Sequence, residues 1–243
     1  MIKETSPNII AIGGGDNSAA LHHAIEMTGV RRPTALIIPT AKTDREWFNE
    51  SVANITDRLT AMGVNARLLH EFDQKPSVER AKDEIGRASL LYTLGGNTPV
   101  LLQALHDANI AQVVRDSIAS GKVYAGLSAG GLLPFELAHT NPSDDPEHEA
   151  WDYQIVNGLG VLPAVATPHA DDHELTPYGS RKLSRGDELI AHFPEAVNLG
   201  YTIDNDASLV VSDGKERVIR TRPDAGVRRI TRSGGALQIE ELS

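Results

Sequence analysis

The sequence predicts an α/β fold with a doubly wound, mostly parallel sheet, and three observations support this prediction. Short apolar segments alternate with stretches of helical periodicity through the first half of the chain. Segments such as TALIIP and SLLYTL are apolar at successive positions, as expected of strands that helices cover on both faces. A chain of 243 residues, 40% hydrophobic and 23% charged, can bury a substantial core. Because the composition shows no break, we expect residues 1–243 to form a single domain.

The elements of the first half follow in chain order. The predicted strands are short runs rich in aliphatic residues: Asn8–Ile12, Thr34–Pro39, Ala66–Leu69 and Ser89–Leu94. The predicted helices between them carry apolar residues three or four positions apart: Asn17–Met27, Asp44–Met62 and Ser77–Ile85. A further helix is expected in PVLLQALHDA, directly after Thr98. Since successive parallel strands need a crossover connection, this alternation predicts parallel pairing.

The pattern changes in the second half. The segment LLPFELA after Gly131 is expected to be helical, and Thr140–Ala150 (TNPSDDPEHEA) is expected to be an acidic loop. Gly158–Thr167 returns to strand-like sequence, and a helix is expected around Arg181–Ala191. The segment ASLVVSDGKERVIR predicts a hairpin with Asp213-Gly214 at its turn, which would form an antiparallel edge of the sheet.

Composition narrows the classes of function. With 33 acidic and 23 basic residues the net charge is −10, which disfavours nucleic acid and anionic membranes as partners. The absence of cysteine excludes disulfides, thiolate zinc sites and a cysteine nucleophile. The N-terminal segment is too short for a signal peptide, and no apolar run has membrane-spanning length. We therefore expect a cytoplasmic protein.

A Gly-x-Ser-x-Gly motif from Gly126 to Gly130 joins a predicted strand to a predicted helix. At such a junction the serine sits on a tight, strained turn that exposes its hydroxyl at the carboxyl end of the sheet. Ser128 is therefore a candidate nucleophile, and the amide of Ala129 would point toward a developing oxyanion. The alternative is that these small residues serve packing or phosphate binding.

A serine nucleophile needs a base, and the chain contains nine histidines. His169 is the preferred candidate because it follows an apolar strand and Pro168, at the edge of the sheet where active sites of parallel α/β folds form. Surface or structural roles are expected for four others: His22, His23, His70 and His192. His139 and His148, which flank the acidic loop, stay open as alternatives.

The base must in turn be oriented, usually by a carboxylate. Spacing alone does not choose among the candidates, which lie in the acidic loop or directly after His169: Asp144, Asp145, Glu147, Glu149, Asp152, Asp171 and Asp172.

A second glycine-rich strand end, Gly95-Gly96-Asn97-Thr98, precedes the helix PVLLQALHDA. Because glycine allows close approach of a backbone amide, Gly96 could be the second oxyanion donor beside Ala129. The alternative, a tight turn with Thr98 as the helix N-cap, is compatible with that role.

The order and spacing of G-G-N-T at Gly95–Thr98, G-x-S-A-G at Gly126–Gly130 and P-H at Pro168-His169 resemble the S51 serine peptidases, a family that includes aspartyl dipeptidase and cyanophycinase. Weaker agreement extends to GYTIDNDASLVV near the C-terminus. The resemblance implies a class I glutamine-amidotransferase-like three-layer sandwich in which serine replaces cysteine. It also implies Ser128 as nucleophile, His169 as general base and the Gly96 and Ala129 amides as the oxyanion hole.

The resemblance extends to the third catalytic residue and to the substrate. It places the acid at Asp152, in WDYQIVNGLG, with Glu147 and Glu149 as alternatives. It implies substrate contacts by Asn97 and by an arginine, Arg181 or Arg185. The expected substrate is a small peptide, first a dipeptide with N-terminal aspartate and second a cyanophycin-like β-linked Asp-Arg unit. No cofactor is implied, and a homodimer is suggested.

Two local patterns admit other interpretations. Gly13-Gly14-Gly15 after the first strand could bind a dinucleotide, but the following strand ends without an acid to meet a ribose. His169 and His173 lie four apart with carboxylates between them, but the flanking prolines disfavour the helix that a metal site would need, so no metal is expected.

Two other functions were weighed on the same scaffold. A non-catalytic binding protein would most naturally lack a catalytic residue, whereas serine, histidine and acids are all present here. Amidotransferase chemistry is disfavoured because it uses a cysteine.

Overall fold

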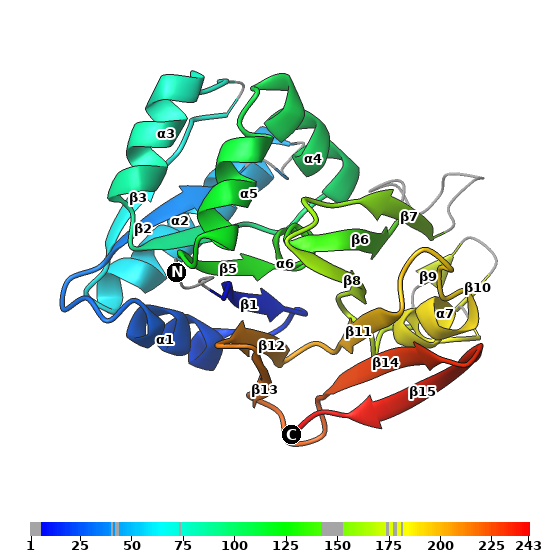
Figure 1. The fold of residues 1–243 in the computed structure, drawn as a ribbon. Helices are drawn as coiled ribbons and strands as arrows, with labels where there is room; N and C mark the ends of the chain where they lie inside the picture. Colours follow the sequence, from blue (N-terminus) through cyan, green and yellow to red (C-terminus); the bar gives the residue numbers. More distant parts are fainter. Residues whose placement is uncertain are drawn as a thin grey trace, which may run out of the picture.

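The computed structural model describes residues 6–39, 41, 44–72, 74–141, 153–173, 175–176, 179–180 and 182–243. Two sheets dominate the fold (Figure 1). The first has seven strands in the order β13-β12-β1-β5-β4-β2-β3, and the second has six in the order β15-β14-β11-β8-β6-β7. The structure therefore confirms the α/β class and the doubly wound sheet of the first half.

Five consecutive strands of the first sheet, from β1 to the edge strand β3, pair in parallel. They are β1 (Asn8–Ile12), β2 (Thr34–Ile38), β3 (Asn65–Leu68), β4 (Leu90–Thr93) and β5 (Val123–Leu127). The C-terminal hairpin completes one edge with β12 (Ala207–Ser212) and β13 (Lys215–Arg220), both antiparallel. Asp213 and Gly214 at its turn have φ values of 52° and 69°, as a type I′ turn requires. The predicted antiparallel edge is confirmed.

Helices cover both faces of this sheet (Figure 1). α1 (Ser18–Met27) and α2 (Arg45–Ala61) pack through one apolar cluster that includes Leu21 and Leu59. α3 (Val78–Arg87), α4 (Thr98–Asp107) and α5 (Ala111–Ala119) pack through another on the opposite face. Strands such as β2 and β4, whose sequences are apolar at successive positions, are thus buried from both sides.

One predicted helix cap is wrong. Thr98 is the first residue of α4, and Asn97 is the N-cap, because its side-chain Oδ1 accepts a hydrogen bond from Val100 N at 3.0 Å.

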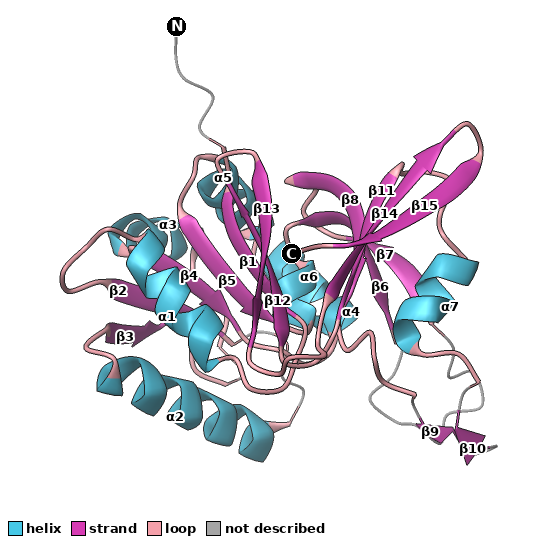
Figure 2. Ribbon diagram, turned by 90° about the horizontal axis from the view of Figure 1, so that it is seen from below, coloured by secondary structure: helices cyan, strands magenta, loops and turns pink. Residues whose placement is uncertain are grey.

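The second sheet was not predicted beyond the strand-like segment at 158–167. Its strands are β6 (Phe135–Thr140), β7 (Gln154–Asn157), β8 (Leu162–Thr167), β11 (Leu199–Ile203), β14 (Val227–Ser233) and β15 (Ala236–Glu241). A separate small pair is formed by β9 (Leu175–Thr176) and β10 (Gly179–Ser180). Figure 2 shows the two large sheets side by side, with α7 (Arg185–Ala191) on the outer side of the second. An apolar cluster with members from both sheets joins them, among them Ala11, Leu209, Ala166 and Tyr201.

The expectation of a helix in LLPFELA is wrong. α6 (Ala129–Leu132) has only four residues, and β6 begins at Phe135. Pro134 cannot donate the hydrogen bond of a helix interior, and β6 gains pairing with β7 and β8 instead. The late helix also starts later than predicted, at Arg185, where Ser184 caps it by accepting a hydrogen bond from Asp187 N at 3.2 Å.

Candidate active site

The Gly126–Gly130 segment forms a tight turn between β5 and α6. Ser128 adopts φ 52° and ψ −115°, a left-handed conformation that is strained for a residue with a side chain. A Cβ on Gly126 would collide with the backbone of Gly130, and one on Gly130 would collide with the Thr93 carbonyl. The two glycines therefore allow the strand and the helix to cross closely. The turn exposes the serine at the carboxyl end of the sheet, where the sequence predicted it.

The side chain of His169 faces this serine. His169 follows β8 of the second sheet, also has a positive φ of 50°, and places Nε2 2.9 Å from Ser128 Oγ. This is a hydrogen-bond distance for a nucleophile and its base. The ring is partly exposed, with 27% of the side chain accessible, so a substrate can reach it. The loops after β5 and β8 thus bring together residues 41 positions apart.

Asn205 contacts the other ring nitrogen of His169, and the sequence analysis missed this residue. Its Oδ1 lies 2.7 Å from His169 Nδ1. Its Nδ2 donates to Asp171 Oδ1 at 3.0 Å and to Asp172 Oδ1 at 2.8 Å. Because carboxylates only accept, these two bonds fix which end of the amide faces the histidine. His169 Nδ1 must then carry the proton that Oδ1 accepts, and the lone pair of Nε2 faces Ser128.

The carboxylates behind Asn205 form the outer part of the site. Asp172 Oδ2 lies 4.0 Å from His169 Nδ1, beyond hydrogen-bond distance. Asp171 also accepts from the Asn205 backbone amide at 2.8 Å and pairs with Arg222 at 2.6 Å. Of the acids that the sequence offered, Asp171 and Asp172 therefore lie near the histidine, and the structure connects them to it through Asn205.

The first glycine loop lies beside the same histidine. A Cβ on Gly14 would collide with Asn205 Oδ1 and with the imidazole of His169. The loop after β1 thus lines the top of the sheet next to the serine. Because Gly14 has no side chain, the imidazole of His169 can pack against this loop.

The second glycine-rich loop lies on the other side of Ser128. A Cβ on Gly95 would be 3.1 Å from Ser128 Cβ, and Gly96 has a φ of 145° that favours glycine. Ala129 begins α6 and is buried. Within the described part of the chain, the amides of Gly96 and Ala129 donate no hydrogen bond. Both amides are therefore available to an oxyanion above the serine.

Several predicted residues lie outside the described part of the chain: Asp144, Asp145, Glu147, His148, Glu149, Asp152 and Arg181. The alternative arginine, Arg185, is only 4% exposed. It donates to Thr167 Oγ1 at 3.1 Å and to the His139 carbonyl at 3.2 Å. The Arg185 guanidinium is therefore hydrogen-bonded inside the protein, beside β8. The other predicted substrate contact, Asn97, uses its side-chain oxygen to cap α4.

Two other histidines, His139 and His70, are buried in the structure. His139 is buried, with Nδ1 3.0 Å from Thr167 Oγ1, and burial lowers the pKa of His70. Neither lies at the serine.

No group of three or more histidine, aspartate or glutamate side chains within the described ranges could hold a metal ion. No helix of the described structure is both long enough and apolar enough to cross a membrane.

Comparisons with known proteins identify the family and the fold. Residues 8–219 match the model of a family described as "Peptidase family S51". A "Peptidase E" from Haemophilus influenzae is 29% identical over 204 residues, which are 82% of this chain and 88% of the relative. A "Probable alpha-aspartyl dipeptidase" from Drosophila melanogaster is 31% identical over 162 residues, 66% of this chain and 61% of the relative. The crystal structure of a peptidase from an acI-B1 Actinobacterium has the same fold, with a TM-score of 0.65 at 16% identity, covering 99% of this chain and 96% of that one.

Proposed function

The chain belongs to peptidase family S51 and is a serine-type peptidase, and we propose that it hydrolyses small peptides, first of all dipeptides with N-terminal aspartate, through Ser128 and His169. The observation that carries this proposal is the 2.9 Å contact between Ser128 Oγ and His169 Nε2, on a histidine whose tautomer Asn205 fixes. The preference for aspartate rests on the names of the relatives, a peptidase E and an alpha-aspartyl dipeptidase.

In the proposed first half-reaction, Ser128 Oγ attacks the carbonyl carbon of the peptide bond while His169 Nε2 takes the hydroxyl proton. The negative charge that forms on the carbonyl oxygen is stabilised by the Gly96 and Ala129 amides. When the tetrahedral intermediate collapses, the imidazolium gives its proton to the leaving amine. The carbon–nitrogen bond breaks, and an ester between the acyl group and Ser128 remains.

In the second half-reaction, His169 Nε2 takes a proton from water, and the resulting hydroxide equivalent attacks the ester. The same two amides stabilise the second oxyanion. The proton returns to Ser128 Oγ as the ester bond breaks, which releases the acid and restores the serine. No cofactor is needed for either half-reaction.

Asn205 orients the histidine in this mechanism. An amide oxygen accepts the Nδ1 proton but cannot take it up, so it holds the tautomer and the ring position. A neutral asparagine fills the same role in cysteine peptidases of the papain type. The carboxylates of Asp171 and Asp172 lie one hydrogen bond further away and stabilise the imidazolium through their charge. Asp152, which lies outside the described residues, stays a prediction for this role.

The test compares wild type, Ser128→Ala and Ser120→Ala on α-linked Asp-X, β-linked Asp-Arg and neutral dipeptides, with release of free amino acids as the readout. Ser120 is an exposed serine at the C-terminal end of α5, outside the motif, and serves as the matched control. We expect cleavage of Asp-X by wild type and by Ser120→Ala but not by Ser128→Ala. Cleavage that survives in Ser128→Ala would refute the nucleophile, and cleavage of β-linked Asp-Arg alone would replace the proposed substrate.

A further inference from the structure

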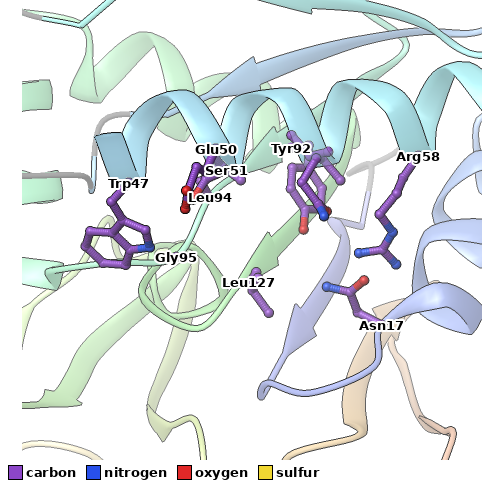
Figure 3. Close-up of a pocket in the computed structure, with 11 residues that line it drawn as sticks. Asn17, Trp47, Glu50, Ser51, Arg58, Tyr92, Leu94, Gly95 and Leu127 are labelled. Atoms are coloured by element: carbon purple, nitrogen blue, oxygen red, sulfur yellow. The ribbon is translucent and has the colours of Figure 1, made fainter. Parts of the chain in front are cut away.

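A cavity of about 290 Å³ opens beside the nucleophile turn (Figure 3). Helix α2 forms one wall, and the ends of β4 and β5 form the other. Gly95 and Leu127 line it, and these residues directly precede Gly96 and Ser128. The volume is near the lower end of the range of ligand pockets, about 300–1,000 Å³. A single amino-acid residue fits such a space, whereas an extended peptide does not.

A half-buried arginine, Arg58, reaches into this cavity from α2. Figure 3 shows its guanidinium directed toward Asn17, on the opposite wall. Among the described residues, it makes no hydrogen bond or ion pair. The acid nearest in sequence to that wall, Asp16, accepts instead from the Ser18 amide at 2.9 Å and the Ser18 hydroxyl at 3.2 Å. Among the described residues the guanidinium is therefore a charged donor without a hydrogen-bond acceptor, and the Asp16 carboxylate acts on it only through its charge.

Asn17 supplies a second unsatisfied group. Its side chain lines the cavity and only 3% of the residue is exposed, yet Oδ1 has no hydrogen-bond partner within the described structure. A buried polar atom without a partner is unfavourable, so such an atom in a native protein calls for an explanation. A ligand that donates a hydrogen bond would provide one. Glu50 lines the same cavity nearer to Leu94, away from Asn17 and Arg58 (Figure 3), and its negative charge favours a ligand that also carries a positive charge.

The direction of the reaction decides which part of a substrate lies here. His169 must protonate the leaving amine, so the leaving group lies on the side of Ser128 that His169 occupies. That side is formed by the Gly14 loop and Asn205. The cavity opens on the side of Gly95 and Leu127, and His169 is not among its lining residues. The cavity therefore receives the acyl side of the substrate, which for a dipeptide is its N-terminal residue.

We propose that this cavity binds the N-terminal residue of the substrate, with Arg58 holding a carboxylate and Asn17 Oδ1 accepting a hydrogen bond from a free ammonium group. The inference rests on the proposed peptidase function and adds the residues that select the substrate. It requires an acyl residue that carries both charges. An α-linked aspartyl residue presents its side-chain carboxylate and its ammonium, and a β-linked one presents its α-carboxylate and its ammonium.

The first experiment measures binding without catalysis. L-aspartate is titrated by calorimetry into Ser128→Ala, into Ser128→Ala with Arg58→Gln, and into Ser128→Ala with Arg87→Gln. Arg87 is an exposed arginine of α3 and provides the matched control. We expect aspartate to bind the first and third proteins equally and the Arg58→Gln protein about 10- to 100-fold more weakly, since a hydrogen bond to a charged group is lost. Equal affinity in all three, or no binding to Ser128→Ala, would overturn the inference.

The second experiment measures selectivity. We expect Arg58→Gln to lower kcat/KM on Asp-Leu about 10- to 100-fold relative to wild type. On Asn-Leu, the same substitution should change kcat/KM less than about threefold, because only the charged aspartate side chain binds the guanidinium. Equal losses on both substrates would overturn the inference while leaving a Ser128-dependent peptidase. If wild type cleaves no dipeptide, the proposed function fails, and the binding experiment still decides whether this cavity takes aspartate. Melting temperatures of all variants show whether they are folded.

Discussion

At the scale of single residues, His169, the proposed catalytic base, is held by an amide with two carboxylates behind it. Of the two polar atoms of the Asn205 amide, Oδ1 is the one that accepts from His169 Nδ1, because Nδ2 donates to Asp171 and Asp172. The arrangement separates two tasks that one aspartate performs in other serine peptidases: holding the tautomer and supplying negative charge. Arg222, which pairs with Asp171 at 2.6 Å, fixes the outer carboxylate in turn.

Replacing Asn205 by alanine tests this arrangement. We expect kcat/KM on the preferred dipeptide to fall about 10²-fold, because the imidazole loses the hydrogen bond that sets its tautomer. Asn65→Ala, on an exposed asparagine of β3, is the matched control and should leave activity unchanged. The measurement is steady-state kinetics together with labelling of Ser128 by a fluorophosphonate. Wild-type rates in Asn205→Ala would transfer the orienting role to another residue, with Asp152 first in line.

The predictable part of the site consists of residues at strand ends. Ser128 and His169 were found because each polar residue follows an apolar strand, and the carboxyl ends of parallel strands meet at one edge. Asn205 carries the same signal, shortly after the strand LGYTI, but an asparagine does not stand out as the partner of a histidine because that partner is usually a carboxylate. The cavity that holds Arg58 had no sequence signal, because an arginine on a helix surface is usually solvated.

At the scale of elements, the turn between β5 and α6 depends on glycine for its geometry. We expect Gly126→Ala to lower kcat/KM by at least about 10²-fold and to reduce stability. The added Cβ collides with the Gly130 backbone, so the turn must open and move Ser128, and a displacement near 1 Å costs about that much in rate. Kinetics and urea unfolding measure the two effects.

Gly86→Ala is the control for that substitution. Gly86 lies in α3, and a Cβ there would meet nothing within 4 Å. Alanine should therefore stabilise the protein, by about 0.5–1 kcal/mol, and leave activity at the wild-type level. If Gly126→Ala behaved like Gly86→Ala, the close crossing of β5 and α6 would not be what positions the serine.

The elements that the sequence predicted well are those whose signals are local. The alternation of strand and helix up to β5 follows from apolar runs and caps, such as Ser77 before α3. The second sheet joins strands from distant parts of the chain, and β14 (VRRITRS) carries three charged residues among its seven. Such strands are specified by their neighbours more than by their own composition, which is why LLPFELA was mistaken for a helix.

At the scale of the whole molecule, the active site lies where the two sheets meet. Ser128 follows a strand of the first sheet and His169 a strand of the second. Asn205 lies in the connection from β11 to β12, where the chain passes from the second sheet to the first. The apolar cluster between the sheets therefore also holds the proposed catalytic residues in position relative to one another. Stability of the whole fold and integrity of the site are linked by this arrangement.

That stability should depend on pH through a histidine outside the site. His70 is 8% exposed, its Nδ1 lies 2.8 Å from the Glu71 carbonyl, and its ring packs near Phe48. Burial lowers the pKa of His70 below its ordinary value of 6.5. Below pH 6.5 the unfolded chain binds a proton at this residue that the folded chain does not, so the free energy of unfolding must fall as the pH is lowered. The contribution is fully present above pH 6.5 and is lost as the pH falls toward the folded-state pKa.

Urea unfolding of wild type and His70→Gln between pH 7.5 and 5 checks this prediction. Glutamine does not titrate, so its own cost is constant with pH, and the difference between the two proteins isolates the histidine. We expect the wild-type free energy of unfolding to decrease more steeply below pH 6.5, by at most about 1.4 kcal/mol per pH unit. Other groups also have shifted pKa values, such as Asp187, whose pKa is lowered, and Asp204, whose pKa is raised. Their contributions to the free energy of unfolding are the same in both proteins and cancel in the difference. Parallel pH profiles would mean that His70 is protonated as readily in the folded chain as in the unfolded one.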